Sequence, residues 1–434
     1  MIILNQIKTI ISVKKTLLFF LILFTQLTLV AKDGYIINFE TKNLQGKTIE
    51  ISHYYGSSRI FYSKNIVAIS ENEQSVSVKE NAKILGGIYK INFIGQKNYK
   101  DIIIDNGDSL SFSIDGIDIE NLTALNSEKN KLFFLYPSIQ NDSIISTFLS
   151  NHSKSVGSLF FKLEAKRRNV PAYYSKRAEY QRTFWDSIDL KNDQLRYLPN
   201  IYKTLNLFNE LQPINDSLYS RSMNQVLNQV ETNSDNFEFY LTWYFKNMRY
   251  QQLYYLDNTF INTYKKYFDT LNIEFKNLSS FRSIERTYDD VFANKKGEVI
   301  SDFNFLDSND STYTLSKIYP NNDYTLIAFY DPYCSHCQKA MPKISLLFSE
   351  LKATSGKKIE TIGMLNAYEK EGWKEFIVEN NMINWINLYS KDPNKEYQED
   401  FNSYSNPRFF LVDRNGILVS RSGDTKILYS IIKQ

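Results

Sequence analysis

The hydrophobic pattern changes character twice along the chain. From residue 33 to about residue 118, short runs of alternating apolar and polar residues are separated by Gly-Gly and Asn-Gly turns. Alternation with a period of two predicts half-buried strands, and such turns are typical of hairpins. The expected strands cover residues 35–39, 48–52, 75–78, 88–94, 101–105 and 109–114. This pattern predicts an antiparallel sandwich or a barrel.

Between about residues 120 and 290, apolar residues recur at spacings of three and four, which indicates helices. Ser153 is the expected N-cap of a helix that runs to about Arg168. Residues 195–208 form a second apolar stripe, and residues 237–268 are the richest in aromatic side chains. We interpret these aromatic side chains as core packing between helices. The alternative is that they line a groove for a ligand or peptide.

The pattern changes again after residues 294–298, which we interpret as a linker. Strands are then expected at residues 299–305, 312–315, 324–330, 358–365, 409–412 and 417–420, and helices at 340–351, 373–380 and 427–432. Mixed strands and helices predict an α/β domain. The chain is therefore expected to be multidomain. Its predicted parts are a β-rich sandwich or barrel-like domain (32–119), an α-helical aromatic-rich domain (120–290) and the α/β domain (291–434).

Residues 1–31 differ from everything that follows. A leader with Lys8, Lys14 and Lys15 precedes an apolar run from residue 16 to residue 30, and Ala31 follows it. This order is typical of a secretory signal peptide. The run is shorter than the roughly 20 residues of a membrane-spanning helix. We therefore expect cleavage and export to the periplasm or cell envelope, whereas an uncleaved segment would keep the protein membrane-associated.

The charge balance disfavours one class of partner. The chain has 51 Lys and Arg against 48 Asp and Glu, a formal net charge of +3. The three lysines of the leader account for this excess. A neutral remainder gives no electrostatic basis for binding nucleic acid.

The candidate chemistry lies in Cys334-Ser335-His336-Cys337, which contains the only two cysteines of the chain. The motif stands between the β-rich run 324–330 and a helical pattern. The free N–H groups and the positive end of a helix stabilise an anion in the first turn. We therefore expect a thiolate at Cys334, with Cys337 one turn further on as the resolving thiol. An imidazolium at His336 would favour the thiolate and make the disulfide more oxidising.

A structural disulfide and a zinc site both fit the cysteine pair less well. A structural disulfide that closes so small a loop would add little stability. A zinc site needs about four ligands, and only His53, His152 and His336 are available beside the two cysteines. No metal is expected, and no cofactor apart from the redox-active disulfide itself. We interpret His53, which stands next to two tyrosines, as a packed histidine.

The C-terminal segment resembles the thioredoxin fold, and within it the periplasmic TlpA/ResA-like branch. The matching stretches are Ser301-Asp302-Phe303-Asn304-Phe305, Thr314-Leu315-Ser316-Lys317-Ile318, Phe329-Tyr330-Asp331-Pro332-Tyr333 before the cysteine pair, Met341-Pro342 after it, and Asn406-Pro407 before Phe409-Phe410-Leu411-Val412-Asp413. The resemblance implies that Cys334 is the exposed attacking thiol and Cys337 the buried resolving thiol. It also implies a cis peptide bond before Pro407, with the Asn406 backbone presented to the extended chain of a substrate.

Two positions depart from the family pattern. Thioredoxins often carry a buried acid six residues before the first cysteine, and the TlpA/ResA-like branch often carries a Glu three residues after the second. Here these positions are Ala328 and Ala340. The proton acceptor for Cys337 is then open between water, His336 and Glu350.

The sequence thus predicts an exported thiol–disulfide oxidoreductase that exchanges disulfides with envelope proteins through Cys334 and Cys337. The residues expected to tune the pair or to position the substrate are Ser335, His336, Asn406 and Pro407. The implied partners are protein thiols and disulfides of the envelope and a membrane or periplasmic redox donor or acceptor. The alternative is an envelope binding protein whose thioredoxin-like domain is redox-sensitive or degenerate. The direction of electron flow stays open, because His336 favours an oxidising pair and the family branch a reducing one.

Overall fold

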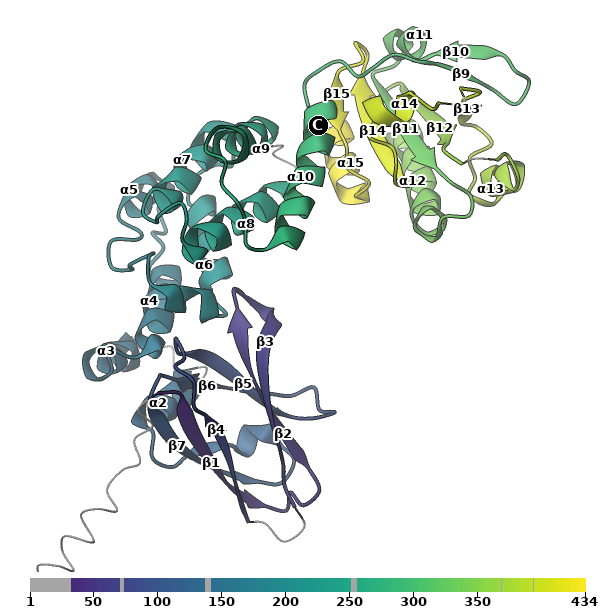
Figure 1. Cartoon of the computed structure of the whole chain (residues 1–434). Helices are drawn as coiled ribbons and strands as arrows, with labels where there is room; N and C mark the ends of the chain where they lie inside the picture. Colours follow the sequence, from purple (N-terminus) through teal and green to yellow (C-terminus); the bar gives the residue numbers. More distant parts are fainter. Residues whose placement is uncertain (1–32, 71–73, 137–141, 251–255, 368, 393) are drawn as a thin grey trace, which may run out of the picture. The chain divides into compact units, whose positions relative to one another are not determined.

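The computed structural model describes residues 33–70, 74–136, 142–250, 256–367, 369–392 and 394–434, without the side chains of residues 57–64, 142, 249 and 250 (Figure 1). The predicted signal peptide lies outside these residues. The chain divides into two compact units, one up to Gln212 with Gln229–Glu231, and one of Pro213–Asn228 with Thr232–Gln434. The domain boundaries after residues 119 and 290 stay predictions. Among the described helices, none is long and apolar enough to cross a membrane.

The first unit begins with two four-stranded sheets, in the strand orders β4-β1-β7-β8 and β3-β2-β5-β6. The strands are β1 (Tyr35–Lys42), β2 (Thr48–Tyr55), β3 (Ser57–Ala68), β4 (Ser75–Glu80), β5 (Gly87–Phe93), β6 (Lys100–Ile104), β7 (Asp108–Asp115) and β8 (Thr123–Ala124). Alternate residues of both sheets, such as Phe39 and Ile51, are buried in one shared core. The β-rich sandwich is therefore confirmed.

One strand pair departs from the expected antiparallel order. β1 and β7 pair in parallel, with Tyr35 opposite Asp108. Parallel neighbours need a long crossover connection instead of a hairpin, and here the intervening strands β2 to β6 supply it. Sequence alternation predicts that a strand forms but does not select its partner.

Helices follow in the first unit: α2 (Glu128–Leu135), α3 (Asp142–Asn151), α4 (Val156–Arg168), α5 (Arg177–Arg182) and α6 (Ile201–Glu210). The N-cap of α4 is Ser155, whose hydroxyl accepts a hydrogen bond from the Gly157 N–H at 3.2 Å. The prediction of Ser153 as this cap is wrong, because the helix begins only at the fully buried Val156. His53 is packed, as expected, with its ring 5.4 Å from that of Tyr89.

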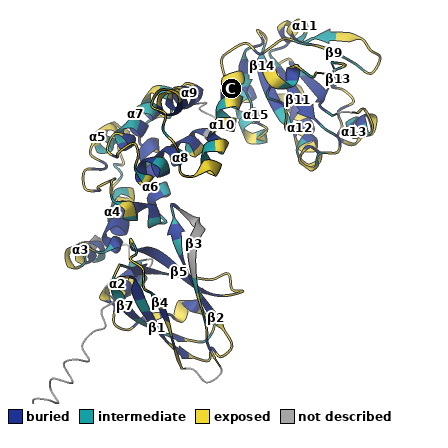
Figure 2. Cartoon of the chain, in the orientation of Figure 1, coloured by how far each residue is buried: buried dark blue, intermediate teal, exposed yellow. Residues whose placement is uncertain are grey.

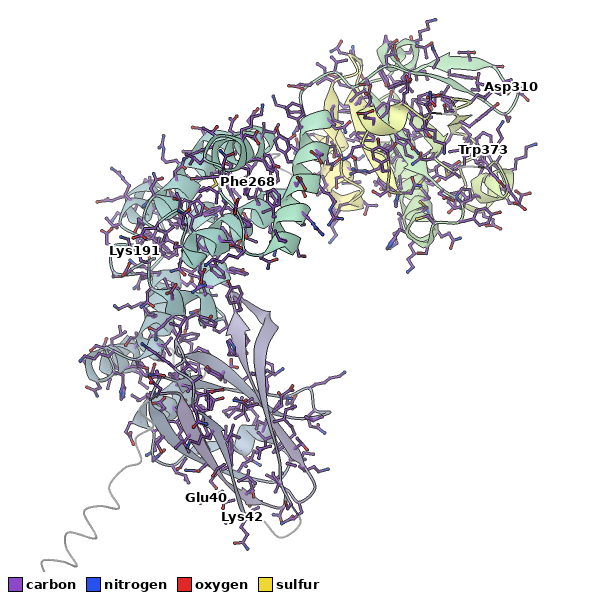
Figure 3. All side chains as sticks on the ribbon, in the orientation of Figure 1. Glu40, Lys42, Lys191, Phe268, Asp310 and Trp373 are labelled. Atoms are coloured by element: carbon purple, nitrogen blue, oxygen red, sulfur yellow. The ribbon has the colours of Figure 1, made fainter. Side chains whose placement is uncertain are left out.

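The helices of the second unit are α7 (Asp216–Leu227), α8 (Asp235–Tyr250), α9 (Asp257–Tyr264) with a π-helical turn (Lys265–Thr270), and α10 (Leu278–Ala293). Aromatic side chains of α8 such as Phe237, Tyr240 and Tyr244 are at most 1 % exposed. Phe268, labelled in Figure 3, packs on Phe245 with 5.9 Å between ring centroids. The core interpretation of the aromatic segment is confirmed for its described residues, while residues 251–255 lie outside them.

A seven-stranded sheet completes the second unit, in the order β10-β9-β13-β12-β11-β14-β15. The strands are β9 (Asn304–Leu306), β10 (Thr312–Thr314), β11 (Tyr324–Tyr330), β12 (Ile359–Leu365), β13 (Ile386–Tyr389), β14 (Arg408–Asp413) and β15 (Leu418–Ser420). β11 runs parallel to β12 and antiparallel to β14. The strand expected at residues 299–305 is shorter than predicted, because Val299 forms only an isolated bridge to Ile417.

Helices cover both faces of this sheet. They are α11 (Leu315–Ile318), α12 (Ser335–Thr354), α13 (Trp373–Glu379), α14 (Tyr397–Asp400) and α15 (Thr425–Lys433). Leu326, Ala328 and Tyr330 of β11 share a core with α12, α13 and α15, whereas Ile327 and Phe329 share one with α11 and α14. Figure 2 shows β11 buried along its length. Burial on both faces explains its continuous apolar sequence.

Two ion pairs join α9 and α10 to this sheet. The Arg408 guanidinium, on the first residue of β14, donates two hydrogen bonds to the Asp290 carboxylate of α10, at 2.6 and 3.1 Å. The Arg421 guanidinium donates to the Asp257 carboxylate of α9 at 2.8 Å. Each of these four side chains is at most 24 % exposed. The helices from residue 257 onward are therefore part of the same folded unit as the sheet.

We predict that Asp290→Asn lowers the free energy of unfolding of this unit by about 1.5–3 kcal/mol, the range for a hydrogen bond to a charged group. Urea unfolding followed by tryptophan fluorescence measures the change. Glu298→Gln is the control, because it removes an exposed ion pair to Lys295 in the same unit and should cost less than about 0.5 kcal/mol. Equal effects of the two variants would contradict the prediction.

Candidate active site

The two cysteines lie where β11 gives way to α12. Cys334 is the N-cap of α12, and Ser335 is the first helical residue. Both cysteines are free thiols; Cys334 is half-buried and Cys337 is fully buried. The Cys334 N–H donates to the Asp331 carbonyl at 3.1 Å, and the Cys334 carbonyl accepts from the Gln338 N–H. The first thiol thus lies at the N-terminal, positive end of a long helix.

The second thiol lies inside the protein. Cys337 belongs to the core formed by β11 and α12, together with Ala328, Tyr330 and Met341. Burial raises the pKa of the Cys337 thiol to about 12, although the Asp331 N–H donates to its sulfur at 3.5 Å and favours the thiolate. Desolvation therefore exceeds the effect of this hydrogen bond. Cys337 stays protonated near neutral pH.

The candidates for the Cys337 proton acceptor differ in their position. Glu350 is exposed and thirteen residues further along α12, about 20 Å along the helix axis at 1.5 Å per residue. It cannot reach Cys337. His336 is exposed, next to the buried thiol in sequence. Asp331, which sequence patterns did not single out, is half-buried, and its charge raises the pKa of Cys337 further.

Asp331 also shapes the approach to the helix. Its carboxylate accepts a hydrogen bond from the Tyr333 N–H at 2.8 Å, across Pro332. This is the bond of an Asx-turn. The signal in the sequence was the Asp-Pro pair, which is separated from Cys334 by Tyr333 alone. One residue thus fixes the loop with its side chain and contacts the Cys337 sulfur with its backbone.

A distant segment meets the cysteines at the start of β14. The Asn406–Pro407 peptide bond is cis, as the resemblance implied. The Cys334 thiol donates to the Asn406 carbonyl, with 3.6 Å between sulfur and oxygen. The structure therefore brings Cys334, Asn406 and Pro407 together. Ser335 and His336 are exposed beside them.

Aromatic residues share the core of Cys337 and flank the site in sequence. Trp373, labelled in Figure 3, donates from its indole N–H to the buried Tyr330 hydroxyl at 2.8 Å. The Tyr330 ring stacks on that of Phe376, with 5.0 Å between centroids. Tyr333 and Tyr404 are 67 % and 69 % exposed, the first next to Cys334 and the second two residues before Asn406. Buried aromatic side chains thus pack around Tyr330 at the end of β11, and two exposed tyrosines stand close in sequence to Cys334 and Asn406.

The described residues contain no cluster of potential metal ligands. No group of three or more His, Cys, Asp or Glu side chains there could hold a metal ion.

Comparisons with known proteins agree with this architecture. Residues 321–418 match a protein-family model described as thioredoxin-like. This confirms the thioredoxin-type fold that the motifs implied for the C-terminal domain. No curated protein matches the chain.

Several solved structures, three of them from Bacteroides, are similar to parts of this chain. A thioredoxin-like protein from Bacteroides caccae is 14 % identical over 61 % of this chain and 97 % of its own, with a TM-score of 0.46. The thioredoxin domain of a thiol-disulfide oxidoreductase from Bacteroides vulgatus is 24 % identical over 32 % of this chain and 95 % of its own, with a TM-score of 0.28. A thiol:disulfide interchange protein from Bacteroides sp. is 22 % identical over 32 % and 90 %, with a TM-score of 0.29.

We predict that the alkylation rate of Cys337 rises about tenfold per pH unit from pH 7 to pH 10, because only the thiolate reacts and its fraction grows tenfold per unit below the pKa. The measurement uses Cys334→Ser, which leaves Cys337 as the single thiol, and iodoacetamide followed by mass spectrometry. A short unstructured peptide with one cysteine is the reference; its rate should level off above the ordinary thiol pKa of about 8.5. A plateau for Cys337 below pH 9 would mean that burial does not control this thiol.

Proposed function

We propose that this protein is an exported thiol–disulfide oxidoreductase that exchanges disulfides with protein substrates through Cys334 and Cys337. One observation carries the proposal. An accessible thiol at a helix N-terminus lies 3.6 Å from the Asn406 carbonyl beside a cis peptide bond, and a buried thiol lies one helical turn behind it. This arrangement offers a nucleophile, a resolving thiol and a backbone surface for a substrate.

The reaction proceeds in two exchanges. The Cys334 thiolate attacks one sulfur of a substrate disulfide, so that the substrate S–S bond breaks and a mixed disulfide forms. The released substrate thiolate takes up a proton. Cys337 then loses its proton and attacks the Cys334 sulfur, which frees the second substrate thiol and closes the Cys334–Cys337 disulfide. Two electrons pass to the substrate, and an external dithiol must restore the enzyme; the reverse sequence donates a disulfide.

The two thiols differ in a way that suits these roles. Cys334 is accessible and Cys337 is not, so a protein disulfide meets Cys334 first. The high pKa of Cys337 keeps it protonated until the second step. Asp331 and His336 are the candidate proton acceptors in this chain for that step, together with water. Ser335 and His336, both exposed, would tune the pair and contact the substrate.

The extended backbone of a substrate would pair with Asn406, in the manner of a strand added to a sheet edge. The partners proposed are thiols and disulfides of envelope proteins, and a membrane or periplasmic donor or acceptor that resets the pair. Export is supported by the leader, apolar run and small residue in residues 1–31. No cofactor beyond the redox-active disulfide is proposed.

The alternative function, that of an envelope binding protein, rested partly on an aromatic groove. The described aromatic side chains of residues 237–268 are instead buried against one another, as in the contacts of Phe245 with Phe260 and Phe268. No contact among the described residues favours that function over disulfide exchange.

We predict that the two single-cysteine variants both lose turnover but differ in whether they trap a mixed disulfide. With insulin as the disulfide substrate, Cys334→Ser should lower turnover by more than about 100-fold, because the attacking atom is lost. Cys337→Ser should also stop turnover but should accumulate a mixed disulfide through Cys334, since nothing resolves it. Non-reducing electrophoresis and intact mass detect the adduct. An adduct on Cys334→Ser, or full activity of either variant, would contradict the assigned roles.

A further inference from the structure

A buried amide lies behind the loop that faces Cys334. Asn366 follows β12 directly and is 6 % exposed. Its backbone N–H donates to the Tyr330 carbonyl at 2.7 Å, which ties it to the end of β11. Its side chain therefore starts from a fixed point at the carboxyl edge of the sheet.

The Asn366 side chain uses its whole capacity for hydrogen bonds. The Nδ2 group donates to the Ser403 carbonyl at 2.6 Å and to Asn406 Oδ1 at 2.8 Å. The Oδ1 atom accepts from the Tyr397 hydroxyl at 3.0 Å and from Gln398 Nε2 at 2.7 Å. An amide has two donor hydrogens and two acceptor lone pairs, and all four are engaged. A buried amide satisfied on every side holds one orientation, because losing any partner leaves a buried polar group unpaired.

The loop returns one bond to the same residue. Asn406 Nδ2 donates to the Asn366 carbonyl at 3.3 Å. The loop from Ser403 to Pro407 is thus fastened to Asn366 at three points. The two residues that flank this loop are joined separately, because the Arg408 guanidinium donates to the Asn402 carbonyl at 2.8 and 3.0 Å.

The hydrogen bonds of Asn366 are connected to the Cys334 sulfur through Asn406. Asn366 holds the side chain of Asn406, and Asn406 presents its carbonyl to the Cys334 thiol at 3.6 Å. We propose that Asn366 is a positioning residue, which fixes the Ser403–Pro407 loop so that the Asn406 backbone is ready to bind the substrate chain beside Cys334. This role rests on the proposed disulfide exchange.

Two substitutions test the donor bonds and the acceptor bonds of the Asn366 amide separately. Asn366→Asp keeps the shape and still accepts from Tyr397 and Gln398. It no longer donates, and it places a carboxylate oxygen against the Ser403 carbonyl and Asn406 Oδ1. Tyr397→Phe removes one bond to Oδ1 and leaves the three bonds to the loop in place.

The control is another amide of the same domain that donates to backbone carbonyls. Asn387 Nδ2 donates to the carbonyls of Met382 and Trp385 at 2.8 and 3.0 Å, and neither lies in the loop. Asn387→Asp therefore imposes the same chemical change, a lost pair of donor bonds, away from Cys334.

The experiment uses the full chain with three readouts: KM and kcat for insulin reduction driven by dithiothreitol, the alkylation rate of reduced Cys334 by iodoacetamide, and hydrogen–deuterium exchange of the peptide that covers residues 401–410. For Asn366→Asp we expect KM to rise about tenfold or more, since small misplacements of a docking surface are costly. We also expect faster exchange in residues 401–410 and an alkylation rate within about twofold of wild type, because iodoacetamide needs no backbone docking. Tyr397→Phe should shift KM less, and Asn387→Asp not at all.

Several outcomes would overturn the proposal. Unchanged exchange in residues 401–410 would mean that Asn366 does not hold the loop. Faster exchange with unchanged KM would mean that the held loop does not serve substrate binding. Equal losses for Asn366→Asp and Asn387→Asp would reveal general destabilisation only. A wild-type chain that does not reduce insulin would remove the proposed function and the substrate-binding part of this role, while the exchange measurement would still decide whether Asn366 holds the loop.

Discussion

The antiparallel pairing of β11 with β14 is the constraint on which the site depends. Its register places Phe329 opposite Arg408, so the residues that follow β11 and those that precede β14 emerge at the same edge of the sheet. Cys334 comes five residues after one partner, and Pro407 directly before the other. Segments more than seventy residues apart are thereby brought to a sulfur–oxygen distance of 3.6 Å. A slip of one residue in this register would turn the side chains of β14 to the opposite face.

Burial then makes two identical thiols unequal. Cys334 caps α12 at the surface, whereas Cys337 is enclosed by the core between α12 and β11. Because α12 turns once between them, a single helix supplies both the accessible and the protected sulfur. Tyr330 packs in the same core as Cys337. Its hydroxyl accepts a hydrogen bond from Trp373, and its ring stacks on that of Phe376. The proposed division of labour between attack and resolution therefore follows from packing, with no need for a further ionisable group in the core.

Local pattern predicted what is local in this structure. The apolar run 324–330 and the spacing after Cys337 were enough to place the motif between β11 and α12. The cis peptide before Pro407 was implied only by the resemblance to the thioredoxin fold. The missed features depend on tertiary contacts. β13 has only four residues, Ile386–Tyr389, too few for a period to be recognised. Asn366 is one polar residue after an apolar strand, and its importance comes from Ser403 and Asn406, which no local pattern connects to it. Ion pairs such as Arg408–Asp290 likewise join α10 to the sheet across the predicted linker.

The most direct test of a catalytic pair is the reduction potential of Cys334 and Cys337, measured in the full chain by equilibration against dithiothreitol and glutathione buffers. Exchange through an accessible Cys334 predicts a potential above about −300 mV, within the range where oxidoreductases of this kind pass electrons to and from other dithiols. A potential below about −300 mV would identify a structural bridge that resists reduction, and it would contradict the proposed function.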